Sequence, residues 1–289
     1  MLKLFTDTDC DMTPAVCAEY GYSLISMPYS IDGKTVYPYV DFKEFDSKAF
    51  YDLLRGGVLP TTSALNEEQY RQYFEPVFAA GDDIFYVHFS RNMSATFGPM
   101  DAVVKELKEK YPERKFYEVD TKGITIVSYL IAREIGDMFK AGKTPEEVLE
   151  WASTEVDHFA QYFFADNLKF FRRSGRVSNL AATMGGLIGL RPVIHMNAEG
   201  RMLSLCTVKG RTQVMEKIVD YVCQLGDDVK SHRVVIASTN YDEASEQVAA
   251  MLREKFGEDL AIEIIQVNPT AGSHCGPDAM GVAFHSTGR

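Results

Sequence analysis

Hydroxyl and imidazole side chains that could hold an anion occur at three separate places in the sequence. Thr62 and Ser63 follow a proline, and Ser94 comes shortly after a strand-like run. His274 lies in a stretch rich in glycine and proline, which is expected to be a loop between two strands. Two hydroxyl groups and an imidazole N–H can together hold a carboxylate or a phosphate. Each group also has a simpler explanation, because hydroxyls cap helices and a histidine can stand in a surface turn.

Asp7 and Asp9 follow the first strand-like run and favour a different chemistry. A calcium loop is excluded because Met12 stands where such a loop needs glycine. A phosphoaspartate site of a haloacid-dehalogenase-like phosphatase is closer, with Ser90 as the hydroxyl after a second strand. Such a site also needs an acidic pair after a later strand, whereas the acidic pairs of this sequence precede strands. A small-molecule phosphohydrolase that uses Asp7 and Asp9 is therefore the alternative function.

Motifs for nucleotide binding, zinc binding and serine hydrolysis are missing from the sequence. There is no Walker loop and no dinucleotide fingerprint. Ser94 does not lie in a Gly-x-Ser-x-Gly elbow, and Asp278 is only a weak candidate for an acid that orients His274. The five cysteines are odd in number and include no CxxC pair, which argues against disulfides or structural zinc. We therefore expect neither a metal nor a cofactor.

The balance of charges limits the partners of the chain. It has 289 residues, of which 30 are basic and 41 acidic, giving a formal net charge of −11. This excess of acid opposes general binding to nucleic acid or to an anionic membrane. No apolar run approaches the roughly 20 residues that span a bilayer, and a strand-like run follows Met1 where a signal peptide would begin. We expect a cytoplasmic protein without integral membrane association.

One strongly basic run, Arg172–Arg176, stands out in this acidic sequence. It is explained either by a solvated turn or by a patch that docks a partner or neutralises a phosphate. Arg191, Lys209 and Arg211 could extend such a patch. The residues alone leave both explanations open.

Short strand-like runs alternate with helical patterns along the chain. This alternation predicts an α/β fold in which mostly parallel or mixed sheets are flanked by helices. Strands are expected at Lys3–Thr6, Asp83–Phe89, Lys115–Val119, Gln161–Ala165, Met202–Val208, Arg233–Ser238 and Ala261–Val267. A helix is expected after Thr144, because Thr144 and Glu147 form a capping box around Pro145.

Two domains are expected, since the chain exceeds the usual size of a single domain and its apolar share of 46% can supply two cores. We place them at residues 1–160 and 161–289, where a long helix gives way to a strand. Ligands of open α/β sheets bind beyond the carboxyl ends of the strands, and hydroxyl groups are plentiful there in this chain. The last residues, His285–Arg289, are expected to form a frayed tail.

Six segments resemble, in order and approximate position, the signature of the DegV family of bacterial fatty-acid-binding proteins. They are Phe5–Pro14 (FTDTDCDMTP), Pro60–Ser63 (PTTS), Ser90–Phe97 (SRNMSATF), Leu168–Ser178 (LKFFRRSGRVS), Leu190–Ile194 (LRPVI) and Asn268–Pro277 (NPTAGSHCGP). The resemblance covers essentially the whole chain. Two positions depart from it, because Ala95 and Ser174 stand where the family favours glycine.

The resemblance implies a two-domain α/β protein that holds a long-chain fatty acid in the crevice between its domains. Matched motif to motif, the carboxylate contacts fall on Thr62, Ser94 and His274, with Ser63 as a neighbour. Arg176 matches a family arginine at the head-group end of the pocket. The acyl chain is expected to contact some of Phe163, Phe164, Leu168, Leu180, Met184, Leu187, Ile188, Leu190, Val193 and Ile194.

The resemblance also implies a partner. Similar proteins present the bound carboxylate to a separate fatty acid kinase, which makes an acyl phosphate from ATP. On this interpretation the chain is a lipid-binding subunit that is not catalytic alone. Lys209 and Arg211 fall where the kinase would dock.

Overall fold

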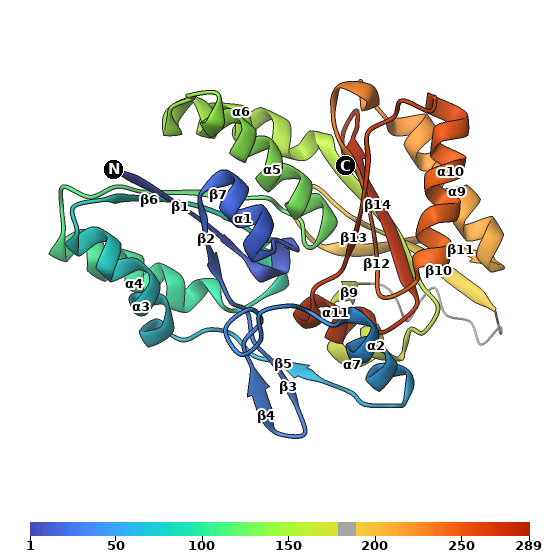
Figure 1. Ribbon diagram of the computed structural model, residues 1–289, viewed down its shortest axis with the longest axis horizontal. Coiled ribbons are helices and arrows are strands. Elements are labelled where there is room, and N and C mark those ends of the chain that lie inside the picture. Colours follow the sequence, from blue (N-terminus) through green and yellow to red (C-terminus); the bar gives the residue numbers. More distant parts are fainter. Residues whose placement is uncertain (179–188) are drawn as a thin grey trace.

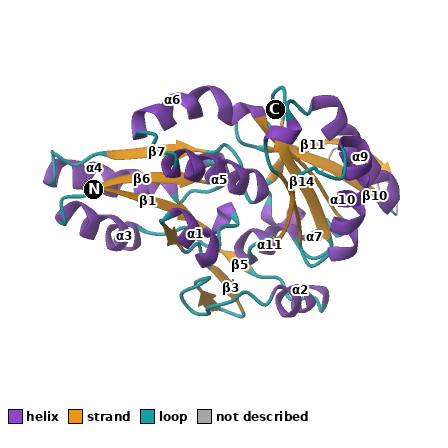
Figure 2. Cartoon of the chain, turned by 45° about the horizontal axis from the view of Figure 1, so that its top comes forward, coloured by secondary structure: helices purple, strands orange, loops and turns teal. Residues whose placement is uncertain are grey.

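The computed structural model describes residues 1–178 and 189–289, which form an α/β fold with two large sheets and one small sheet (Figure 1). Helices lie on both sides of the large sheets, and α5 (Ile126–Lys140) lies between the two (Figure 2). The predicted fold class is confirmed.

The first large sheet comes from the N-terminal half of the chain and is parallel throughout. Its strand order is β2-β1-β6-β7. The strands are β1 (Leu2–Asp7), β2 (Tyr22–Ile25), β6 (Asp83–His88) and β7 (Phe116–Asp120). Residues 84–88 are fully buried, as expected for an inner parallel strand covered on both faces. The three strands predicted here are confirmed to within a residue, and β2 was missed.

Five helices accompany this sheet. They are α1 (Pro14–Tyr20), α3 (Glu67–Ala79), α4 (Phe97–Lys110), α5 and α6 (Pro145–Glu155). In Figure 1, α3 and α4 lie on one face of the sheet, while α1, α5 and α6 lie on the other. The predicted capping box of α6 is confirmed, because Thr144 Oγ1 accepts from the Glu147 N–H at 3.2 Å and Glu147 Oε2 accepts from the Thr144 N–H at 2.8 Å.

The second large sheet is mixed, with the order β13-β12-β14-β8-β10-β11-β9. The strands are β8 (Phe159–Ala165), β9 (Val177–Ser178), β10 (Leu190–Met196), β11 (Met202–Lys209), β12 (Val234–Ser238), β13 (Ile262–Gln266) and β14 (Ala279–His285). The four strands predicted at β8, β11, β12 and β13 are confirmed. Helices α9 (Arg211–Leu225) and α10 (Asp242–Phe256) cover its outer face (Figures 1 and 2).

A small antiparallel sheet of three strands lies to one side, and the sequence analysis did not predict it. It comprises β3 (Tyr29–Ile31), β4 (Lys34–Val36) and β5 (Thr61–Thr62). Three short helices pack beside it, namely α2 (Ser47–Arg55), α7 (Lys169–Ser174) and α11 (Pro269–Cys275). Tyr51 of α2 ties this group to the second large sheet, because its hydroxyl donates to the Val267 carbonyl at 2.7 Å.

Helix α5 joins the two large sheets. Its residues 126–132 are all buried, so it is covered on every side rather than along one stripe. One continuous apolar cluster includes residues of β1 and β6, of α5, and of β8, β12 and β14. The second sheet begins at Phe159, and the division of the chain into residues 1–160 and 161–289 stays a proposal.

The predicted frayed tail at His285–Arg289 is wrong. The guanidinium of Arg289 donates to the carbonyls of Phe159, Lys122 and Thr121 at 2.6, 2.5 and 2.9 Å. Burial lowers the pKa of Arg289 to about 10. Three carbonyl acceptors compensate for this burial and hold the tail against β8 and the loop after β7.

Candidate functional site

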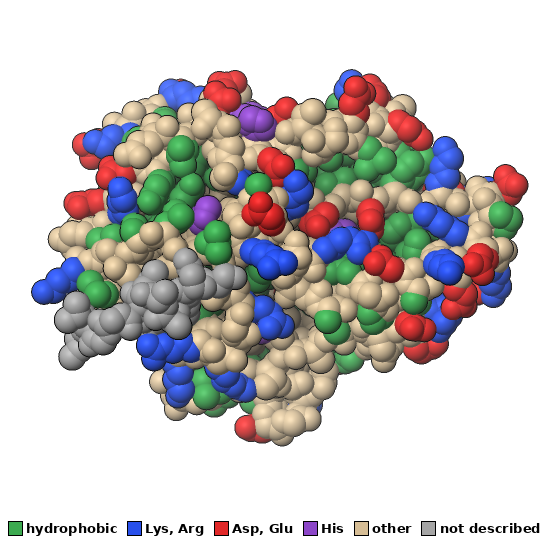
Figure 3. All heavy atoms as spheres, turned by 180° about the vertical axis from the view of Figure 1, so that it is seen from behind, with side chains coloured by type: hydrophobic (Ala, Val, Ile, Leu, Met, Phe, Trp, Pro, Cys, Tyr) green, Lys and Arg blue, Asp and Glu red, His purple; other side chains and the backbone are tan. Residues whose placement is uncertain are grey.

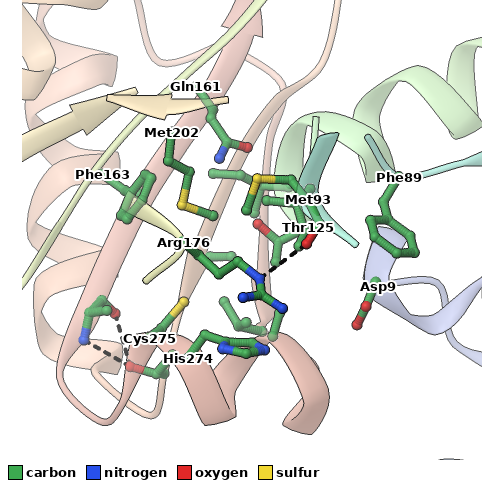
Figure 4. Close-up of a pocket in the computed structure, with 18 of the residues that line it drawn as sticks. Asp9, Phe89, Met93, Thr125, Gln161, Phe163, Arg176, Met202, His274 and Cys275 are labelled. Atoms are coloured by element: carbon green, nitrogen blue, oxygen red, sulfur yellow. Dashed lines mark hydrogen bonds between the residues drawn. The ribbon is translucent and has the colours of Figure 1, made fainter. Parts of the chain in front are cut away.

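A cavity lies between the two large sheets at the carboxyl ends of β1 and β6. It encloses about 700 Å³, part of it open to solvent. The side chains that line it are mostly apolar and come from the second large sheet, from α5 and from the segments that follow β1 and β6, among them Phe89, Ile126, Phe163, Ala237 and Met280. Figure 4 shows several of them around the empty space. A long apolar ligand fits such a lining better than a polar one.

The position of the cavity follows from the strand order. The chain moves from β1 to β2 on one side and later places β6 on the other side of β1. The connections at the carboxyl ends of β1 and β6 therefore diverge, which opens a crevice at that point in doubly wound sheets. Asp9 follows β1 and Ser94 follows β6, and both line the cavity.

A second cavity of about 470 Å³ adjoins the first and has a polar lining. The two cavities share Asp9, Phe89, Ser94, Arg176 and His274. The second one is also lined by the hydroxyl residues Thr62, Ser63, Thr96 and Thr270. The structure thus brings together the five residues predicted to bind a carboxylate, which are Thr62, Ser63, Ser94, Arg176 and His274.

His274 is tied to Thr62 across the polar cavity. Its Nε2 lies 2.9 Å from Oγ1 of Thr62, at the end of β5. The predicted loop around His274 is wrong, because the residue lies in α11. Asn268 caps this helix by accepting from the Ala271 N–H at 2.9 Å, and Pro269 occupies its first turn.

The imidazole of His274 is neutral above mildly acidic pH. Burial, together with the positive charges of Arg176 and Arg173, lowers its pKa to about 4. A neutral imidazole carries one N–H and one acceptor nitrogen. It therefore donates one hydrogen bond to a ligand or to Thr62, and the pair can rearrange when an anion arrives.

Two arginines of the basic run hold the loops that carry the hydroxyl groups. Arg173 Nη1 donates to the carbonyl of Pro60 at 3.1 Å, and Arg176 Nε donates to the carbonyl of Met93 at 3.1 Å. Figure 4 shows Arg176 reaching into the site above His274. The run is therefore more than a solvated turn, since it sets the positions of the Thr62 and Ser94 segments.

The hydroxyl-bearing segments are also linked to each other by residues that the sequence analysis did not single out. Thr96 Oγ1 accepts from the Leu65 N–H at 3.1 Å and lies 2.8 Å from the Tyr70 hydroxyl. The Thr96 N–H in turn donates to Ser94 Oγ at 3.2 Å. Buried Thr96 therefore fixes the distance between the loop after β5 and the Ser94 turn.

Comparison with known proteins decides the family. A family model described as uncharacterised protein, DegV family, matches residues 1–287. The chain belongs to the DegV family. A DegV domain-containing protein of Clostridium perfringens is 28% identical over 97% of this chain and 96% of its own length.

Solved DegV structures have the same fold. A fatty-acid-binding DegV family protein of Thermus thermophilus has a TM-score of 0.86 at 19% identity, with 99% of each chain covered. A DegV family protein of Eubacterium eligens, loaded with heptadecanoic acid, has a TM-score of 0.83 at 16% identity and covers 99% of this chain and 100% of its own.

The two departures from the DegV signature fit the backbone without strain. Ala95 does not adopt a positive φ, and Ser94 before it is extended, with φ −150° and ψ 146°. Ser174 is the last residue of α7, and the left-handed position that needs glycine is Gly175, with φ 65°. Neither substitution forces a side chain into a conformation that only glycine tolerates.

The phosphatase alternative finds little support in the geometry. Asp7 is fully buried, and its oxygens accept from the Tyr86 hydroxyl and the N–H groups of Cys10 and Phe89 at 3.0, 3.2 and 3.4 Å. Ser90, the expected partner hydroxyl, is buried and donates to the carbonyl of Gly200 at 2.8 Å. Both side chains therefore serve the fold rather than face a substrate.

The expected set of pocket-lining residues is confirmed at one position. Among the candidates that the structure describes, Phe163 lines the cavity, whereas Phe164, Leu168, Leu190, Val193 and Ile194 do not. Phe164 and Val193 lie in a second core between the sheet and helices α9 and α10. Leu180, Met184, Leu187 and Ile188 lie outside the described residues.

The two predicted docking residues differ in their surroundings. Arg211 Nε donates to Asp166 Oδ2 at 2.7 Å, and Arg191 pairs with the other oxygen of that carboxylate. Lys209 is exposed at the end of β11. Figure 3 shows further Lys and Arg side chains gathered toward its lower left, with few acidic ones among them.

None of the helices within residues 1–178 and 189–289 is both long and apolar enough to cross a bilayer. The same ranges hold no group of three or more His, Cys, Asp or Glu side chains that could bind a metal ion.

Proposed function

We propose that this DegV family protein binds one long-chain fatty acid. The acyl chain occupies the apolar cavity between the two large sheets, and the carboxylate lies in the adjoining polar cavity. The observation that carries the proposal is this adjacency, because an apolar and a polar space meet at Ser94, Arg176 and His274. The solved relatives that contain or bind fatty acids support it.

The free energy of binding has a contribution from each cavity: burial of the acyl chain in the apolar one favours binding, and burial of the carboxylate in the polar one opposes it. Each buried CH₂ contributes about 0.8 kcal/mol, so a chain of about sixteen carbons contributes on the order of 10 kcal/mol before ordering costs. A buried carboxylate without partners would cancel much of this gain. The hydroxyls of Thr62 and Ser94, the His274 imidazole and the Arg176 guanidinium are the groups that compensate the charge, and Ser63 is a further donor at the rim.

We further propose that the protein presents the bound carboxylate to a separate fatty acid kinase in the cytoplasm, and that it does not catalyse acyl phosphate formation alone. The head-group end of the site supports this, because Ser63 and Arg176 are exposed there. Lys209 and Arg211 are the proposed docking residues. Since the sequence has no Walker loop or dinucleotide fingerprint, ATP is assigned to the partner.

The decisive experiment is denaturing solvent extraction of the purified protein followed by mass spectrometry, with native mass spectrometry for stoichiometry. Near one fatty acid per chain is expected. The variants Ser94→Ala and His274→Ala are expected to keep the fold and retain less, since each lost charge-assisted hydrogen bond costs about 1.5 to 3 kcal/mol. A protein that carries no fatty acid and takes up neither palmitate nor oleate would overturn the proposal.

A further inference from the structure

Asp9 is a buried carboxyl group that lines both cavities, and one of its oxygens has no hydrogen-bond partner among the described residues. Its residue is 8% exposed, and its Oδ1 atom is buried and unpaired within the part of the chain that the structure describes. Asp9 lines the apolar cavity as well as the polar one. A buried polar atom without a partner is rare and costs free energy, so it indicates a ligand that completes the site.

The backbone holds Asp9 in this position. It belongs to the 3-10 turn η1 (Thr8–Cys10), which Asp7 caps by accepting from the Cys10 N–H. The Asp9 carbonyl accepts from the Thr125 N–H at 2.7 Å. Figure 4 shows Asp9 on the side of the site opposite the second large sheet, with Arg176 and His274 nearer to that sheet. A ligand head group placed among Arg176, His274 and Ser94 therefore meets Asp9 from the remaining side.

The surroundings of Asp9 disfavour its ionised form. Burial raises its pKa well above the usual range, and the carboxyl groups of Asp7 and Asp11 raise it further. The other titratable or charged groups near Asp9 are Cys10, Tyr70, Cys275, His274 and Arg176. Of these, Arg176 is the cation, and its Nε and Nη1 already donate to the carbonyls of Met93 and Ser174. A second carboxylate that enters this space adds to the repulsion.

We propose that the Asp9 carboxyl group donates its hydrogen to the carboxylate of the bound fatty acid, so that the two groups share one proton. This inference rests on the proposed function and adds to it a donor that neither the hydroxyls nor His274 supply. Two carboxyl groups at hydrogen-bond distance cannot both ionise without strong repulsion, and one shared proton removes that repulsion. Arg176 then balances the single remaining negative charge.

The shared proton makes retention depend on pH in a defined direction. While Asp9 keeps its proton, the ligand is bound by all its partners. Once the pH rises above the pKa of Asp9 in the free protein, binding requires the uptake of a proton, so affinity falls by about tenfold for each pH unit until the pKa of the shared proton in the complex is reached. Asp7 and Asp11, whose pKa burial raises to about 7, also gain charge in this range, and they do so in any Asp9 variant.

The test measures the affinity of delipidated protein for oleate across neutral and alkaline pH, together with the carboxyl signal of [1-¹³C]oleate in NMR spectra of the complex. Four full-length proteins are compared: the full chain without substitution, the variants Asp9→Asn and Asp9→Ser, and the control Glu109→Gln. Asparagine and serine each keep a neutral hydrogen-bond donor at position 9. Glu109 is an exposed acid of α4 away from both cavities. Thermal unfolding establishes that each variant is folded.

The expected result is a loss of affinity with rising pH in the full chain and in Glu109→Gln, and a flatter profile in Asp9→Asn. Throughout that loss the carboxyl signal of oleate bound to the full chain is expected to stay between the shifts of the free acid and the free carboxylate, because the complex keeps the shared proton. The inference is overturned if the full chain and Asp9→Asn lose affinity in parallel, or if the bound signal is that of a fully ionised carboxylate in the pH range of the loss. If the full chain binds no oleate at any pH, the proposed function falls too, so the two failures are distinguishable.

Discussion

Asp11 and Asn268, which are 257 positions apart, are joined by two hydrogen bonds in the protein interior. The backbone N–H and the side-chain Nδ2 of Asn268 donate to Oδ1 of Asp11 at 2.8 and 2.7 Å. Asn268 is also the residue that caps α11. The bond therefore connects the turn after β1, which carries Asp9, to the helix that carries His274.

Removing this connection is expected to destabilise the fold. In Asp11→Ala, two donors of Asn268 lose their acceptor inside the protein, at a cost of about 1 to 3 kcal/mol in the free energy of unfolding. Urea denaturation measures the change. Asp220→Ala, at an exposed position of α9, is the matched control and is expected to stay within about 0.5 kcal/mol of the unchanged protein. Equal stability of the two variants would contradict the role of Asp11.

Thr62→Val tests the hydroxyl that faces His274. Valine keeps the shape of threonine and suits a strand, so β5 is expected to form, while the ligand and His274 lose a hydroxyl partner. The affinity for palmitate is expected to fall by about tenfold or more. Thr61→Val is the control, because Thr61 is exposed on the other face of β5 and lines neither cavity. A similar affinity in both variants would remove Thr62 from the site.

Most strands of the two large sheets could be predicted because they are apolar runs bounded by polar turns, whereas β2, β9 and β10 were missed. The small sheet could not be predicted, since β3, β4 and β5 have at most three residues each, and β4 and β5 include exposed side chains. Helix α11 was mistaken for a loop because Gly272, Gly276 and Pro277 are residues typical of turns. The structure explains Gly272, since a Cβ there would lie 2.3 Å from the Tyr51 hydroxyl oxygen.

The candidate site, too, could be predicted only in part from the sequence. The residues proposed to bind the head group could be named from local motifs, whereas the cavity lining depends on which strands meet across the two sheets. Phe163 and Phe164 are adjacent in β8 and equally apolar, but alternation along the strand sends them to opposite faces. Asp9 was considered as part of a phosphatase site, and its unpaired oxygen became visible only once η1 was packed against α5 and α11.

His274 is expected to make the free energy of unfolding of the delipidated protein fall as the pH falls. A histidine of an unfolded chain titrates near about 6.5, and the folded pKa of His274 is lowered to about 4. Between these values the unfolded chain binds a proton that the folded protein does not, so this part of the stability is lost as the pH falls. In His274→Gln the loss of unfolding free energy between about pH 7 and about pH 5 is expected to be smaller. Urea denaturation at both pH values checks this, and an identical loss in the two proteins would refute it.

Docking to a kinase is tested by reversing two charges at the edge of the second sheet. Lys209→Glu combined with Arg211→Glu is expected to leave oleate binding unchanged, since neither residue lines a cavity. Acyl phosphate formation with ATP and a purified fatty acid kinase is expected to fall by at least about tenfold, because like charges across an interface cost several kcal/mol. Arg191 still pairs with Asp166 in this variant, which preserves the local fold.

The control for that variant is Lys105→Glu combined with Lys255→Glu, which makes the same change of charge at exposed positions of α4 and α10. Because the chain already carries a formal net charge of −11, a general loss of attraction to the kinase would affect both double variants alike. A loss confined to the Lys209 and Arg211 pair locates the kinase at the end of β11. If the Lys209→Glu and Arg211→Glu double variant binds oleate and supports normal acyl phosphate formation, the docking surface lies elsewhere on the protein.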